Sequence, residues 1–132
     1  MIMSAKPKLL VLCVEDDAGM LDLLRLHLES AGYTFLGAYD GVEGLDMMYS
    51  EQPDLILLDL MLPEVDGAEL LLRKKQDPAI RDIPVIAVTA LSSPFDQIMW
   101  QEHTEIKAYV TKPFRRKELL DTIKRVMAGN SD

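Results

Sequence analysis

The sequence predicts a three-layer α/β sandwich, in which one parallel sheet of five strands lies between helices. Two observations predict it: short apolar runs alternate with segments of helical periodicity five times along the chain, and residues 55–58 are apolar at every position. Such unbroken runs are typical of strands buried on both faces of a parallel sheet. Strands that alternate with helices favour right-handed crossovers, which place helices on both faces.

Length, composition and charge fit one acidic domain. The chain has 132 residues, 48% of them hydrophobic, and its formal net charge is −8. Direct binding to nucleic acid or to an anionic membrane is not expected, because both depend on clustered Lys and Arg. The longest apolar run, residues 9–14, is too short to cross a bilayer. We therefore expect a cytoplasmic protein.

The domain is expected over residues 9–128, between a loose polar leader at 1–8 and a short tail at 129–132. The first strand is expected at residues 9–14. The single cysteine, Cys13, lies inside this strand and can form no internal disulfide, so it is interpreted as a small buried apolar group. Neither histidine has a His or Cys neighbour at metal-ligand spacing.

The first helix follows an acidic loop. Its apolar positions recur at helical spacing, and Gly32 is expected to end it in the C′ position; these positions are Met20, Leu21, Leu24 and Leu28. Residues 33–38 then give a short second strand, and residues 42–51 give a second helix.

Residues 54–59 are predicted to form the third strand. A helix is disfavoured there because Pro53 and Pro63 leave only nine residues between them, and proline inside a helix removes a donor and clashes with the preceding turn. The remaining elements are a helix at 67–76, a strand at 83–89, a short helix over about 95–102, a strand at 108–111 and a closing helix at 116–127.

Polar side chains follow the ends of four predicted strands: Glu15 and Asp16, Asp59, Thr89, and Lys112. The carboxyl ends of parallel strands share one edge of the sheet, which is where open α/β sheets bind ligands. Carboxylates that converge there repel one another and favour a hard divalent cation. Magnesium would leave positions free for phosphate oxygens, and Lys112 could neutralise a phosphoryl group.

Each of these residues also has a purely structural explanation. Asp59 could form a turn, and Glu15 and Asp16 could favour the positive end of the first helix. Thr89 could be an ordinary strand residue, and Lys112 a solvated surface charge. Their joint placement at one edge of the sheet favours a magnesium site suited to phosphoryl chemistry.

Four motifs occur in the order VEDD (14–17), DLMLPEVDG (59–67), TA (89–90) and AYVTKPF (108–114). With them, nearly the whole chain resembles the receiver domains of two-component response regulators. The resemblance implies a flavodoxin-like fold with strand order 2-1-3-4-5, as in the chemotaxis regulator. It departs from many receivers at residues 105–108, which read Glu-Ile-Lys-Ala where those have Gly-Ala followed by two acids.

The resemblance implies a role for each site residue. Asp59 would be the phosphoacceptor, Asp16 would bind Mg²⁺ directly, Glu15 would act largely through water, and Met61 would offer its backbone carbonyl. Lys112 would hold the phosphoryl group. Domains of this kind catalyse their own phosphorylation and dephosphorylation without being enzymes in the ordinary sense.

Thr89 and Tyr109 would form the switch pair, and Pro113 would follow a cis peptide bond that directs Lys112. Asp17 matches a variable position and is left out of the site. Phosphorylation would alter the face formed by the fourth helix, fifth strand and fifth helix. The partners implied are a sensor histidine kinase or a histidine phosphotransfer protein, and an output protein or effector domain.

In the family, the residues two past the acceptor and two past the switch threonine flank the path of the hydrolytic water. Here they are Met61 and Leu91, both bulky and apolar, so slow self-dephosphorylation is expected.

Three other classes of protein share this fold or this acceptor chemistry. A flavin-binding protein of this fold would need a loop that accepts phosphate, which Glu15, Asp16 and Asp17 would repel. A haloacid-dehalogenase-type hydrolase would need an aspartate at the position of Met61. A receiver-like interaction module that is never phosphorylated is the remaining alternative.

Overall fold

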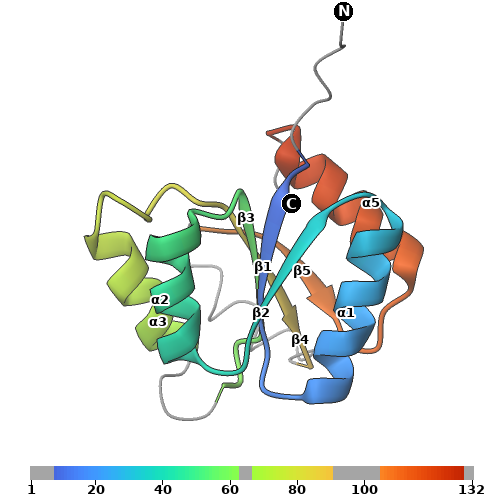
Figure 1. Cartoon of the computed structure of the whole chain (residues 1–132), viewed down its shortest axis with the longest axis horizontal. Coiled ribbons are helices and arrows are strands. Elements are labelled where there is room, and N and C mark those ends of the chain that lie inside the picture. The colour runs from blue at the N-terminus through green and yellow to red at the C-terminus, as the bar shows by residue number, and fades with distance from the viewer. Residues whose placement is uncertain (1–7, 63–66, 91–104, 130–132) are drawn as a thin grey trace, which may run out of the picture.

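The computed structural model describes residues 8–62, 67–90 and 105–129 (Figure 1). The helix predicted over about 95–102 lies outside these ranges, so the helix numbers pass from α3 to α5. The elements are β1 (Leu10–Val14), α1 (Ala18–Ser30), β2 (Thr34–Ala38), α2 (Gly41–Glu51), β3 (Leu55–Leu58), α3 (Gly67–Gln76), β4 (Val85–Thr89), β5 (Ile106–Thr111) and α5 (Arg116–Met127).

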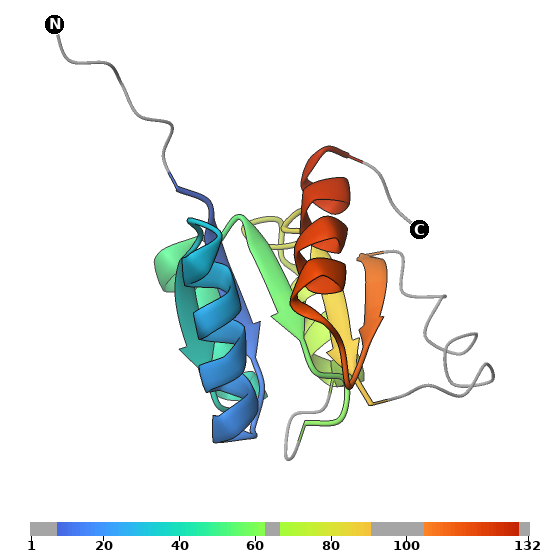
Figure 2. The ribbon, with the colours of Figure 1, turned by 90° about the vertical axis from the view of Figure 1, so that its right-hand side faces the viewer.

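The five strands form one sheet in the order β2-β1-β3-β4-β5, and every pair of neighbours is parallel. Figures 1 and 2 show α1 and α5 side by side over one face and α2 and α3 over the other. The predicted three-layer sandwich and its strand order are therefore confirmed. Within the described ranges, no helix is long and apolar enough to span a bilayer.

Strand β5 begins earlier than the sequence predicted. Its first residue is Ile106, not Ala108, so the stretch that departs from the family pattern forms the start of this strand. Ile106 pairs with Val85, and the register then shifts, so that Ala108 pairs with Ile86. This irregularity explains the error, because it interrupts the alternation from which a strand start is predicted.

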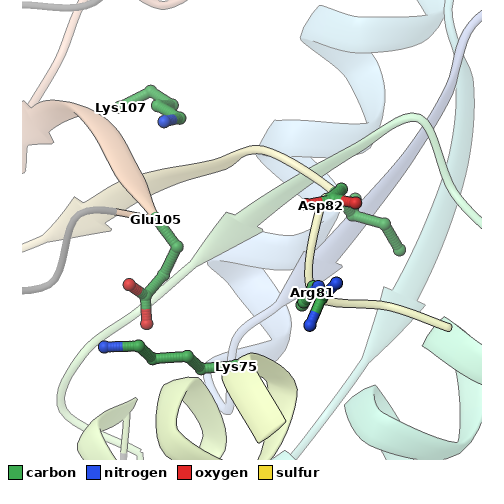
Figure 3. A pocket seen from close by; sticks show the side chains of 6 residues that line it. Lys75, Arg81, Asp82, Glu105 and Lys107 are labelled. Carbon is green, nitrogen blue, oxygen red and sulfur yellow. The ribbon is translucent and has the colours of Figure 1, made fainter. Parts of the chain in front are cut away.

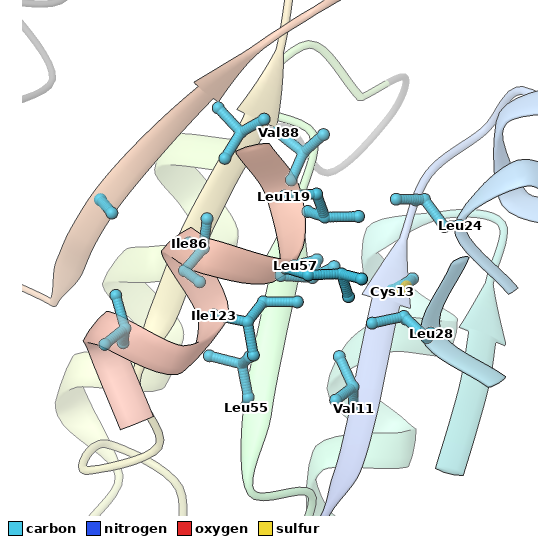
Figure 4. Packing of buried hydrophobic residues seen from close by; sticks show 14 of the residues in the cluster. Val11, Cys13, Leu24, Leu28, Leu55, Leu57, Ile86, Val88, Leu119 and Ile123 are labelled. Atoms are coloured by element: carbon cyan, nitrogen blue, oxygen red, sulfur yellow. The ribbon is translucent and has the colours of Figure 1, made fainter. Parts of the chain in front are cut away.

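Two hydrophobic clusters fill the spaces between the sheet and its helices. Alternate residues of β1 point to opposite faces. Val11 and Cys13 join the cluster under α1 and α5 (Figure 4), whereas Leu12 and Val14 join the cluster under α2 and α3. Cys13 is fully buried, as predicted, and burial raises the pKa of its thiol. The three inner strands β1, β3 and β4 are thus buried almost throughout, whereas the edge strands β2 and β5 are partly exposed.

One charged side chain is buried in the helix layer, formed by α2 and α3, that covers the second hydrophobic cluster. Lys74, in the last turn of α3, has no exposed surface, and its Nζ donates a hydrogen bond of 2.8 Å to the carbonyl oxygen of Arg81. Burial lowers the pKa of Lys74 to about 8, although the nearby carboxylates of Glu105 and Asp82 raise it; Lys107 lowers it further. The ammonium group therefore costs stability wherever it must be protonated in the fold.

We predict that Lys74→Met stabilises the protein at pH 7 by roughly 1–3 kcal/mol, because it replaces a buried charge with an apolar chain of similar length. The difference in free energy of unfolding between the variant and the wild type should become smaller as the pH rises from 8 towards 10. In that range the unfolded wild type still binds the proton that the folded wild type has released, so its stability rises with pH.

The measurement is urea unfolding of both proteins at a series of pH values. A variant that is less stable than the wild type at pH 7 would show that the bond to Arg81 outweighs the cost of burying the charge. Lys75→Met, one residue along the same helix and exposed, is the matched control and should change little.

Candidate functional site

The predicted site residues meet at the carboxyl edge of the sheet. Glu15 follows β1, Asp59 follows β3, Thr89 ends β4 and Lys112 follows β5. The Asp59 amide donates to the carbonyl oxygen of Val14 at 3.0 Å, which ties the ends of β1 and β3 together. These two strands are neighbours in the sheet, but the chain crosses from β1 to β2 in one direction and from β3 to β4 in the other. Open α/β sheets bind ligands at such a point.

The Asp59 carboxylate is held by three donors and is only 7% exposed. Its Oδ1 accepts hydrogen bonds from the Met61 amide at 3.0 Å and from the Thr89 hydroxyl at 3.3 Å. Its Oδ2 accepts a hydrogen bond from the Lys112 ammonium at 3.1 Å. The carboxylate therefore has a fixed orientation, with donors placed where added negative charge would be stabilised.

Lys112 also forms an ion pair with Glu15, although the two residues follow strands that are three positions apart in the sheet. The reach of both long side chains makes this possible, because each strand step is about 4.8 Å. Burial lowers the pKa of Lys112, but its hydrogen bonds to Glu15 and Asp59 outweigh that effect, and the net shift is upward. The lysine is thus held in its charged form.

Glu15 is the most buried acid of the site, with 2% of its surface exposed. Burial raises the pKa of Glu15 to about 7, and the hydrogen bond from Lys112 acts against this shift. The Asp17 amide donates to Glu15 Oε2 at 3.1 Å, while the Asp17 side chain accepts from the Met20 amide at 3.0 Å and caps α1. Asp17, which was left out of the predicted site, therefore has a structural role as the N-cap of α1.

Three carboxylates can converge on one ion. Oxygen atoms of Glu15, Asp16 and Asp59 all lie within 4.8 Å of one another, and Asp16 is exposed to solvent. Such a group of hard oxygen ligands, open on one side, suits Mg²⁺, which keeps several water ligands. Met61, predicted to contribute its carbonyl, lies directly beside Asp59, and its side chain is 60% exposed.

The predicted switch residue Tyr109 lies on β5 opposite Ala87, two residues before the strand position that pairs with Thr89. Its ring packs against the second cluster, and burial raises the pKa of its hydroxyl. Among the described residues, this buried hydroxyl has no hydrogen-bond partner. The predicted cis peptide bond precedes Pro113, whereas Leu91 lies outside the described ranges.

Sequence reasoning missed two contacts that shape the site. One is the pairing of Glu15 with Lys112, which depends on the folded strand order. The other is the close approach of Gly67 to the segment after Asp59: a Cβ at Gly67 would lie 2.9 Å from the Cα of Leu60. The Gly67 amide also donates to the Leu60 carbonyl at 3.3 Å. The glycine at the end of the motif at 59–67 was the sequence feature that could have predicted this close approach.

Comparison with known proteins gives concordant results. The family model of the response regulator receiver domain matches residues 11–124. The DNA-binding dual master transcriptional regulator RpaA of Synechocystis sp. is 39% identical over 117 residues, which are 89% of this chain and 48% of RpaA. The chain thus spans about half the length of that relative.

Two solved structures illustrate the likeness in three dimensions. A putative response regulator from Chloroflexus aurantiacus is 32% identical with a TM-score of 0.86, covering 92% of this chain and 99% of that one. The receiver domain of sensor histidine kinase PA1611 from Pseudomonas aeruginosa, which has a magnesium ion coordinated in its active site cleft, is 27% identical with a TM-score of 0.84 and the same coverage. By fold, by site geometry and by sequence, this chain belongs to the response regulator receiver domain family.

Proposed function

We propose that the chain is the phosphoacceptor of a two-component or phosphorelay system, and that Asp59 accepts the phosphoryl group with the help of Mg²⁺. The observation that supports this most directly is the arrangement around Asp59. Lys112 and Thr89 contact opposite oxygens of its carboxylate, and Glu15 and Asp16 lie within reach of a shared cation.

In the proposed reaction, a carboxylate oxygen of Asp59 attacks the phosphorus of a phosphohistidine or a small acyl phosphate. A new P–O bond forms as the bond from phosphorus to the donor breaks, and the donor leaves with that electron pair. A bound Mg²⁺ would neutralise charge on the phosphoryl oxygens. Lys112 supplies a compact positive charge at the same edge of the sheet, and Thr89 supplies a hydroxyl donor.

Phosphorylation would then change the partner-binding face. The phosphoryl group brings negative charge and acceptor oxygens, which would draw the Thr89 hydroxyl away from Asp59 Oδ1 and keep Lys112 close. Tyr109 lies on β5, two residues before the position that pairs with Thr89, and its buried hydroxyl has no partner among the described residues. A vacated position behind Thr89 would offer this ring a second arrangement, and with it a change in the surface near β5 and α5.

Receiver domains act in two-component signalling with histidine kinases and effectors. For this chain, we propose a sensor histidine kinase or a histidine phosphotransfer protein as donor, and an output protein or effector domain as recipient of the signal. The similar protein RpaA is named as DNA-binding, and this chain matches 48% of it. The net charge of −8 favours a protein partner over nucleic acid for this domain.

The first test of the proposal concerns the acceptor. With Mg²⁺ and a small acyl phosphate, the wild type should gain one phosphoryl group in intact-mass measurement, whereas Asp59→Asn should gain none, because an amide cannot form the mixed anhydride. Peptide mapping of the phosphorylated protein should place the group on Asp59. A wild type that gains no mass with any donor would support the non-phosphorylated interaction module instead.

A second prediction concerns the cation. Asp16→Asn should weaken Mg²⁺ binding by roughly tenfold or more, because it removes one charged ligand, a loss of about 1.4 kcal/mol or greater. Asp17→Asn is the matched control: it removes the same charge one residue away but leaves a side chain that caps α1. Calorimetric titration of both variants with Mg²⁺ would test this. If both variants bound Mg²⁺ equally weakly, the loss of affinity would come from the change in net charge and not from a lost ligand.

A third prediction concerns the lifetime of the phosphorylated state. The Met61 side chain is exposed beside Asp59 and cannot hydrogen-bond an attacking water. Met61→Asn should speed loss of the phosphoryl group by roughly 2- to 10-fold, the effect of about one added hydrogen bond in the transition state. Met61→Leu should leave the rate near that of the wild type. If the asparagine variant loses phosphate no faster, this side chain does not set the lifetime.

A further inference from the structure

The sulfur-containing side chains of the described residues differ widely in their access to solvent. Met61 is 60% exposed. The others are fully buried or only partly exposed, and they are Cys13, Met20, Met47, Met48 and Met127. A dissolved oxidant would therefore meet the thioether of Met61 before any other sulfur in the part of the chain that the structure describes.

The exposure of Met61 follows from the packing of its two neighbours. Leu60 and Leu62 are buried and belong to the cluster under α2 and α3. The Gly67 amide donates to the Leu60 carbonyl and fixes the same segment from the other side. Turning Met61 inward would expose one of these leucines to water, which the hydrophobic effect opposes. The thioether is therefore held at the surface.

The single cysteine does not compete for the oxidant. The reactive form of cysteine is the thiolate, but Cys13 is enclosed in the core and burial raises the pKa of its thiol. A thioether needs no deprotonation, because its sulfur lone pair reacts directly. Peroxide that would oxidise an exposed thiolate in another protein is thus left to react with Met61.

Met61 also lies next to the proposed acceptor. Its amide donates to Asp59 Oδ1 at 3.0 Å, so a chemical change in its side chain takes place beside that carboxylate. A thioether sulfur accepts hydrogen bonds only weakly, whereas the oxygen of a sulfoxide is a polar acceptor. Oxidation would give this position a hydrogen-bonding group that the methionine lacks.

We propose that Met61 is an oxidation site through which a peroxide shortens the phosphorylated state, an inference that rests on the proposed function of Asp59. The thioether sulfur attacks one oxygen of hydrogen peroxide, an S–O bond forms and the O–O bond breaks. The leaving hydroxide takes the proton of the transferred oxygen and departs as water. Sulfur is oxidised by two electrons and the peroxide is reduced by two.

The sulfoxide acts on the step that ends the signal. Its oxygen accepts a hydrogen bond from the water that attacks the phosphorus, and so helps to orient that water. The phosphoryl group is then lost faster while the protein stays oxidised. Enzymatic reduction of the sulfoxide restores the thioether, which makes the change reversible.

The first measurement concerns the site of oxidation. The wild type is treated with limiting hydrogen peroxide and mapped by fragmentation mass spectrometry. We expect Met61 to gain one oxygen before Met20, Met47 or Met127, and well before the fully buried Met48, which is the control within the chain. Oxidation of Met48 as fast as Met61 would overturn the site.

The second measurement is the rate at which the phosphorylated protein loses its phosphoryl group before and after peroxide treatment. Oxidation of the wild type should speed this loss by roughly 2- to 10-fold, the effect of about one added hydrogen bond in the transition state. Treatment with methionine sulfoxide reductases should restore the original rate. In Met61→Leu, peroxide should not change the rate, because this variant keeps every other methionine but has no sulfur at this position.

An unchanged rate in the oxidised wild type, or equal acceleration in Met61→Leu, would overturn the proposal and leave the function of Asp59 intact. A reduced wild type that gains no phosphoryl group from any donor would contradict the proposed function, and this inference with it. The two failures are therefore distinguished by the protein that has not been oxidised.

Amide NMR spectra separate a local effect from general damage. Oxidation should shift the signals of residues 59–61, 89 and 112, at the carboxyl edge of the sheet. The reference is a pocket at the opposite end, where β4 and β5 begin, and Figure 3 shows Lys75, Arg81 and Glu105 among the residues around it. Their signals should stay in place. Shifts that reach this pocket would overturn the assignment of the effect to Met61.

Discussion

One ammonium group holds the carboxyl edge of the sheet together. Lys112 contacts both Glu15 and Asp59, and so connects the ends of β1, β3 and β5 across the width of the site. Without a positive charge there, three carboxylates with oxygens within 4.8 Å of one another would repel strongly. The pairing of β5 with β4 and the hydrogen bond from the Lys112 amide to the Thr89 carbonyl place the lysine at this edge. The orientation of Asp59 then lets its carboxylate accept a hydrogen bond from the ammonium group.

The packing of the sheet explains why the polar residues of the candidate site lie at the strand ends. Both faces are covered by helices and filled with apolar side chains, so polar groups on the strands themselves would be buried without partners. At the strand ends, by contrast, backbone and solvent both remain available. Gly67 adds to this arrangement, because only the absence of a side chain lets α3 begin against Leu60 beside the site.

Periodicity predicted the layers and nearly all the elements, and the position of polar residues at the strand ends predicted that their side chains lie together at the carboxyl edge of the sheet. It could not predict that Glu15 and Lys112 touch, since alternation of strands and helices does not determine the order of strands in the sheet; that order came from the family resemblance. The start of β5 was wrong by two residues, because a register shift at Ile86 breaks the pattern.

Lys74 was missed for a different reason. Three cations in succession at the end of a helix indicate a solvated last turn, and only the packed structure shows that one of them is buried while its neighbour lines a pocket.

The single cysteine has a practical consequence. Cys13 lies in β1 between its strand partners Gly37 and Leu57 and has no exposed surface, so the folded protein shields its thiol from reagents. A thiol reagent can reach it only when β1 separates from a neighbouring strand or from the helices that cover this face of the sheet. The chain thus carries its own reporter of opening around β1, one that needs no added label.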